Sequence, residues 1–159
     1  MATTTFRDIV DSLRAAIEAI APVSRSDVRF SRYPGDASAL APWAEQASEG
    51  AFRVFDVRHA FDTTFIPPHD LVAYLVQHNV LVEVAYPDVS LRYGTGVDVH
   101  GDTVIDDDLF DIDKAIGQPA ARIDGHHDTM FIGQSISPYP GGRIVGLLFQ
   151  LTYNRSIPS

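Results

Sequence analysis

The most regular hydrophobic pattern in the chain lies between Asp102 and Pro119. Its apolar positions recur at spacings of four, three and four, which predicts an amphipathic helix with one stripe toward a core and its aspartates toward water. Thr103 is the expected N-cap, with Asp106 completing a capping box, and Gly117 is expected to end the helix before the proline. The apolar stripe consists of Ile105, Leu109, Ile112 and Ile116.

A second helical pattern runs from Phe6 to Ala21. Thr5 and Asp8 form another capping-box pair at its start, and Pro22 is expected to end it. Apolar residues follow at helical spacing between these signals, so this segment should also cover one face of a sheet. They are Phe6, Ile9, Val10, Leu13, Ile17 and Ile20.

The middle of the chain alternates between strand patterns and long connections. Asp27–Tyr33 is a short candidate strand, and the segment from Ala51 to Val57 is strand-like, with a break after Val54 that indicates a bulge or burial on both sides. Pro34–Gly50 is expected to be a long surface loop. Phe61–Asp70 is interpreted as a turn or an arm, because two consecutive prolines cannot both lie inside a sheet.

The second half of the chain reads mainly as strands. Leu71–His78 fits either a short helix or half of a hairpin, whereas Val80–Tyr86 alternates cleanly and predicts a strand. Ala121–Asp124 and Thr129–Ile136 are further candidate strands, and Ile144–Asn154 predicts a long one after a proline- and glycine-rich turn. One face of that last strand should be apolar, with Val145, Leu147, Phe149, Leu151 and Tyr153 together.

These elements predict an α+β fold in one domain spanning residues 1–159. Its mainly antiparallel sheet is expected to be packed by two amphipathic helices and to carry long loops and an arm. A chain of 159 residues with 45% hydrophobic residues can bury a core of its own. No signal-peptide or membrane-spanning pattern is present, so we expect a soluble protein made in the cytoplasm.

Charge narrows the classes of partner. The formal net charge is −9 at pH 7, so a duplex-binding positive surface is not expected. The chain has no cysteine, which excludes disulfides and thiolate catalysis.

Histidine and aspartate residues make a metal-dependent hydrolase the enzyme hypothesis to weigh. Two clusters, around His100 and around His126, have ligand types suited to zinc or a harder divalent ion, but their spacing matches no metal-site signature. The aspartate run also lacks the order of a calcium loop, and no serine stands in a nucleophile motif. We therefore expect no catalytic, metal or cofactor residue. The cluster members are His100, Asp102, Asp124, His126, His127 and Asp128.

Candidate contact residues for another protein lie in the expected loops. An aromatic side chain in a loop and a stiff apolar arm can both anchor on a partner surface. The remaining histidines, His59 and His78, together with the one in the arm, are expected to be surface or partly buried structural residues. The predicted contact residues are Trp43, Phe65, Pro67, Pro68, His69 and Tyr93.

The order of elements resembles the tail terminator, or tail completion, proteins of long-tailed bacteriophages. The resemblance rests on the capped N-terminal helix, the long loop and arm, the strand VLVEVAYPD, the acidic helix DDDLFDIDKAIG, a hairpin and the closing strand LLFQLTYNRS. It is a resemblance of architecture and contains no diagnostic motif. It implies a small α+β domain without catalytic residues.

In that family, copies form a ring, expected to be hexameric, that caps the tail tube at the head-proximal end and joins it to the neck. The implied partners are further copies of the chain, the tail tube protein and the head–tail connector or stopper, in a virion assembled in the host cytoplasm. DNA would pass through the lumen without specific binding, and an acidic wall repels phosphate over about 8 Å. Another neck or tail-tube subunit of the same assembly is the alternative role.

Overall fold

The computed structural model describes residues 6–20, 30–32, 54–66, 73–87, 101–117, 126–139 and 142–156. Within these ranges lie two helices, α1 (Phe6–Glu18) and α3 (Gly101–Gly117). The strands there are β1 (Ser31–Arg32), β2 (Val54–Ile66), β3 (Ala73–Pro87), β4 (His126–Tyr139) and β5 (Gly142–Ser156).

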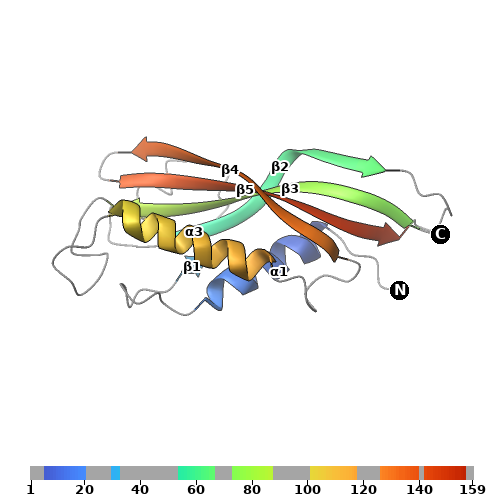
Figure 1. Cartoon of the computed structure of the whole chain (residues 1–159), viewed down its shortest axis with the longest axis horizontal. Coiled ribbons are helices and arrows are strands. Elements are labelled where there is room, and N and C mark those ends of the chain that lie inside the picture. Colours follow the sequence, from blue (N-terminus) through green and yellow to red (C-terminus); the bar gives the residue numbers. More distant parts are fainter. Residues whose placement is uncertain are drawn as a thin grey trace.

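The strands form one five-stranded sheet in the order β1-β2-β3-β5-β4. β1 runs parallel to β2, and the other neighbouring pairs are antiparallel. Both helices lie on the same side of this twisted sheet (Figure 1). The predicted α+β class, with a mainly antiparallel sheet packed by two helices, is therefore confirmed.

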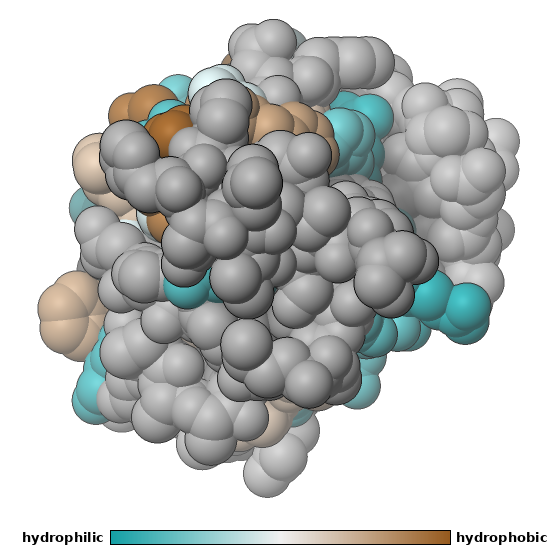
Figure 2. Space-filling model, turned by 90° about the vertical axis from the view of Figure 1, so that its right-hand side faces the viewer, coloured by the Kyte–Doolittle hydropathy of each residue, from teal (hydrophilic) through white to brown (hydrophobic). Residues whose placement is uncertain are grey.

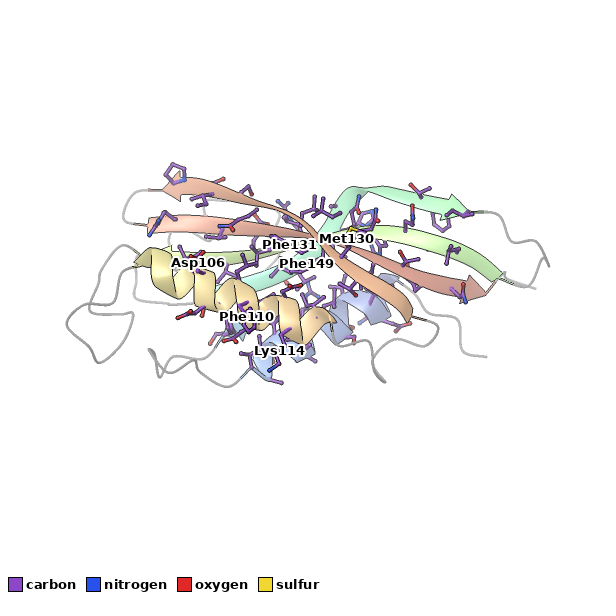
Figure 3. All side chains as sticks on the ribbon, in the orientation of Figure 1. Asp106, Phe110, Lys114, Met130, Phe131 and Phe149 are labelled. Atoms are coloured by element: carbon purple, nitrogen blue, oxygen red, sulfur yellow. The ribbon has the colours of Figure 1, made fainter. Side chains whose placement is uncertain are left out.

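β3 and β5 form the centre of the sheet, and their alternation is as predicted. Val80 lies opposite Phe149, and Val82 opposite Leu147, so the apolar residues of both strands share the face toward the helices. The expected apolar face of β5 is buried throughout. Cross-strand packing continues into β4, where the rings of Phe131 and Phe149 have centroids 5.4 Å apart (Figure 3).

The predicted arm is partly wrong. Phe61–Ile66 continue β2 rather than leaving the sheet, and their register with β3 extends to the pairing of Ile66 with Leu75. The two prolines lie beyond Ile66, so they mark the end of the strand and say nothing about the residues before them. The ladder is irregular only between His59 and Thr63.

The ambiguous segment before Val80 is a strand from Ala73 onward. Tyr74 to His78 pair with β5, and Leu75 to His78 also pair with β2 on the other side. Backbone pairing on both sides satisfies the donors and acceptors that a helix would have satisfied internally.

The start of β2, which belongs to the strand-like segment predicted from Ala51 to Val57, is buried on both faces of the sheet. Val54, Phe55, Asp56 and Val57 are all buried, so continuous burial explains the break in alternation. Phe30, next to β1, packs edge-on against Phe55 with centroids 6.2 Å apart. Of the predicted strand Asp27–Tyr33, the structure describes Phe30 and β1; residues 27–29 and 33 lie outside the described residues.

Helix α3 begins earlier than predicted, at Gly101, so Thr103 lies inside the first turn and is not the N-cap. Ser, Thr and Asp are favoured at several positions in the first turn of a helix. A capping-box pattern therefore locates the N-terminus of the helix only to within one turn. Ile105, Ile112 and Ile116 are buried, and Leu109 packs partly buried against the same core.

One aspartate of α3 does not face water as predicted. Asp108 is fully buried, and the hydroxyl of Tyr86 donates a 2.8 Å hydrogen bond to its Oδ2. Asp108 is three residues after Ile105 and four before Ile112, so it belongs to the core stripe by helical geometry.

Helix α1 ends at Glu18, before the predicted Ala21. A last turn follows, in which the N–H of Ala19 donates to the carbonyl of Ala15 and that of Ile20 to the carbonyl of Ile17, both at 3.1 Å. Ile9, Val10, Leu13 and Ile17 are buried as the pattern predicts.

Candidate interaction surfaces and a buried histidine pair

The structure describes one of the six predicted contact residues. Phe65 lies in β2 with its side chain 49% exposed. An exposed phenylalanine on a strand near the edge of a sheet can contact a partner, although it does not lie on an arm. Trp43, Pro67, Pro68, His69 and Tyr93 lie outside the described residues.

None of the six predicted metal ligands has a described side chain. His126, His127 and Asp128 begin β4, where a bulge between His126 and Asp128 breaks the strand alternation. The side chains of these residues and of Asp102 are not described, and His100 and Asp124 lie outside the described ranges. Among the side chains that are described, no three potential ligands group around one point.

Two histidines expected to be surface or partly buried residues, His59 and His78, form an unpredicted pair across β2 and β3, and for the buried His78 the expectation was wrong. Nδ1 of His59 and Nε2 of His78 are 2.7 Å apart, which is a hydrogen bond whose direction depends on the tautomers. The Tyr153 hydroxyl lies 3.5 Å from Nδ1 of His78. His59 is exposed, whereas His78 is 1% exposed and shares the buried face with Val76 and Val80. The alternation of β3 could have revealed this burial if the segment had been recognised as a strand.

The environment of His78 keeps its ring neutral. Burial, and secondly the neighbouring His59, lower the pKa of His78 from 6.5 to about 4. A neutral His78 ring can accept at Nε2 or donate from it according to its tautomer, so the pair forms a structural hydrogen bond between β2 and β3.

Charged side chains meet at the start of β2. Nε of Arg14, from α1, donates to Oδ1 of buried Asp56 at 2.7 Å, and the same guanidinium donates to the carbonyl of Val57 at 3.1 Å. Asp56 lies opposite Glu83 on β3, whose carboxylate accepts a 2.7 Å bond from Nε of Arg58. Burial raises the pKa of Glu83 in spite of Arg58, and Asp56 raises it further. These four charged side chains form an ion-pair network that connects α1, β2 and β3.

The apolar surface of the described residues is concentrated on two strands. Five of the six exposed large hydrophobic side chains lie on β2 and β4, and the sixth, Phe110, lies on α3 and points away from the sheet (Figure 3). Apolar atoms reach the surface beside polar ones at the end of the molecule shown in Figure 2. The strand residues are Phe65 (49% exposed), Ile66 (38%), Met130 (54%), Ile132 (47%) and Ile136 (52%).

These two strands lie toward opposite sides of the sheet. β4 is the outermost strand on one side, and β2 is separated from the other side only by the two-residue β1. Exposed apolar residues at both sides are suited to contacts between subunits rather than to chemistry in a cleft.

Neither α1 nor α3, the helices of the described ranges, is long and apolar enough to cross a membrane. No protein-family model matches the chain, and no curated protein matches it.

Proposed function

We propose that the chain is a structural virion protein, a tail terminator that forms a ring, hexameric in stoichiometry, on the head-proximal end of a phage tail tube. The ring stops tube growth and presents a surface to the neck connector. The protein acts by assembly rather than by catalysis. This role is the one implied by the resemblance of the element order to tail terminator proteins.

The observation that supports this proposal is the position of exposed apolar side chains on β2 and β4, toward opposite sides of one sheet. A subunit in a ring needs two different contact surfaces, one for each neighbour, and β2 and β4 supply them on opposite sides. The acidic character of the chain supports a lumen through which DNA passes without binding.

The proposal is tested by sedimenting the purified protein with tail tubes from particles of its source. A terminator saturates at one ring per tube end, so the bound amount should follow the number of tubes and not their length. Native mass spectrometry of the released material should give a hexamer. Binding in proportion to tube length would indicate a tube subunit instead, and an absence of binding would contradict the proposal.

A further inference from the structure

The last residues of β4 are exposed on both faces of the sheet and lie at its edge. Residues 134–138 are all exposed, and among the described strands β5 alone pairs with β4. This end of the strand also lies apart from both helices (Figure 1). An edge strand presents backbone donors and acceptors that pair readily with another strand. The end of β4 is therefore suited to accept a further strand at its outer side.

The lack of charge in this stretch favours a second copy of the chain as the partner. From Met130 to Ser137, β4 carries no charged residue, although the chain has a net charge of −9. Two copies of an acidic chain repel one another where their charged surfaces meet, and an uncharged stretch lets them approach. Natural proteins protect edge strands with lysines and other charges, which this stretch lacks. The bulge between Phe131 and Gly133 and the proline at Pro138 limit the length over which an added strand can pair.

The exposed isoleucines of this stretch are spaced symmetrically about Gln134. Ile132 lies two residues before it and Ile136 two residues after it, and their side chains are 47% and 52% exposed. Gln134 pairs with Leu147 on the apolar face of β5, and side chains two residues apart share a face, so the two isoleucines lie on that same face. If two copies of β4 pair antiparallel about Gln134, Ile132 of each copy lies directly opposite Ile136 of the other.

We propose that two copies of the chain form a symmetric dimer in which their β4 edges pair antiparallel about Gln134. The two sheets then continue into one another, and each exposed isoleucine is covered by an isoleucine of the other copy. A two-fold contact needs only one self-complementary surface, which this stretch supplies. The dimer goes beyond the proposed function. In a ring the β4 surface would face a neighbouring subunit, so the dimer is a state of the free chain that competes with ring formation.

Charge substitutions test the contact and its register together. Ile132→Lys and Ile136→Glu each place a charge opposite an isoleucine of the other copy, so each should weaken dimerisation about tenfold in sedimentation equilibrium. The double variant places each lysine opposite a glutamate and should dimerise more tightly than either single variant. Phe110→Lys, on α3 and pointing away from the sheet, should dimerise like the unsubstituted protein (Figure 3). Circular dichroism verifies that all variants are folded.

Three results of these measurements would overturn the proposal. The first is an unsubstituted protein that stays monomeric in concentrated solution. The second is a dimer that I132K and I136E leave as stable as before. The third is a double variant that dimerises no better than the single variants, because the two substituted positions would then not face each other across the axis.

A thiol on the two-fold axis distinguishes this contact from head-to-tail pairing. Directly opposite residues of antiparallel strands have Cα atoms about 4.5–5.5 Å apart, a separation that a disulfide can bridge. The chain contains no cysteine, so Gln134→Cys places a single thiol opposite its own copy. Mild oxidation should link Q134C into dimers and leave Lys114→Cys, at an exposed position of α3, unlinked. Equal linking of the two variants, or unlinked Q134C, would overturn the proposal.

The dimer and the proposed function fail in different ways. Disulfide-linked Q134C from a protein that never binds tail tubes would leave the dimer intact and contradict the terminator role. A protein that caps tubes but whose Q134C variant stays unlinked would retain the terminator role and contradict the dimer.

Discussion

The phenolic hydroxyl of Tyr86 donates a 2.8 Å hydrogen bond to Oδ2 of Asp108, and both residues are buried. Tyr86 ends the core face of β3, and Asp108 lies on the stripe of α3 that covers the sheet. The bond therefore joins the helix layer to the sheet layer. It also explains how a carboxylate is accommodated between Ile105 and Ile112, because a buried acceptor needs a donor.

Removal of this buried acceptor should destabilise the fold. Asp108→Ala leaves a small cavity and deprives the Tyr86 hydroxyl of its acceptor, at a cost of about 1–3 kcal/mol. Asp106→Ala, at an exposed site two residues away, should change the free energy of unfolding by no more than about 0.5 kcal/mol. Urea denaturation of both variants measures the difference. Equal effects would show that the bond contributes nothing to stability.

The ion pair between Arg14 and Asp56 should matter more than the surface pair on the same helix. Arg14→Ala leaves a buried carboxylate without its nearest cation and should cost about 2–3 kcal/mol. Arg7 is almost fully exposed and lies 3.8 Å from Asp11, so Arg7→Ala should change stability by less than about 1 kcal/mol. Thermal unfolding at low and high salt separates the two. An R7A variant as unstable as R14A would contradict this ranking.

The free energy of unfolding should decrease as the pH falls, because His78 has a lowered pKa in the folded protein. Its pKa is about 4 in the folded protein and 6.5 when exposed, so between these values the unfolded chain binds more protons. The contribution is complete above pH 6.5 and is lost as the pH falls toward 4, by up to about 3 kcal/mol. Urea unfolding at pH 7 and pH 5 measures the loss.

The matched variant for this prediction is His78→Gln, which keeps a polar group but cannot titrate. It should be less stable than the unsubstituted protein at pH 7 and should lose less stability between pH 7 and pH 5. An identical pH dependence in both proteins would assign the acid sensitivity to the carboxylates.

Two glycines in adjacent strands should respond differently to alanine. A Cβ at Gly146 would lie 2.6 Å from Oγ of Ser135 and 3.3 Å from Cδ1 of Leu81, so Gly146→Ala should cost about 1–3 kcal/mol. A Cβ at Gly133 would meet no atom within 4 Å, and Gly133→Ala should be neutral or stabilising by up to about 1 kcal/mol. Calorimetric melting temperatures distinguish them. Comparable melting temperatures would mean that Ser135 rotates away without cost.

The periodicity of apolar residues in the sequence predicted the helices and strands that have one face in the core and one face in solvent. The stripe of α3, the alternation of Val80–Tyr86 and the apolar face of β5 all follow from a helix or strand that has one core face. The continuation of β2 through Phe61–Ile66 could not be predicted, because the exposed Thr64 is held in the strand by pairing with β3 and not by burial. Strand pairing over long sequence separation leaves no local signal.

The candidate site was predictable only in part. Asp108 and His78 are polar residues at core positions of α3 and β3, and their partners, Tyr86 and His59, come from other elements. The uncharged stretch of β4 is visible in the sequence, but its place at the edge of the sheet depends on the strand order, which no local pattern encodes.

The central claim, a ring at one end of a tail, is tested most directly by locating the protein on particles of its source. Electron microscopy with a gold-labelled tag should show label confined to a single ring at the head-proximal end of the tail. Label along the whole tail would make the protein a tube subunit, and particles without label would contradict a role in the virion.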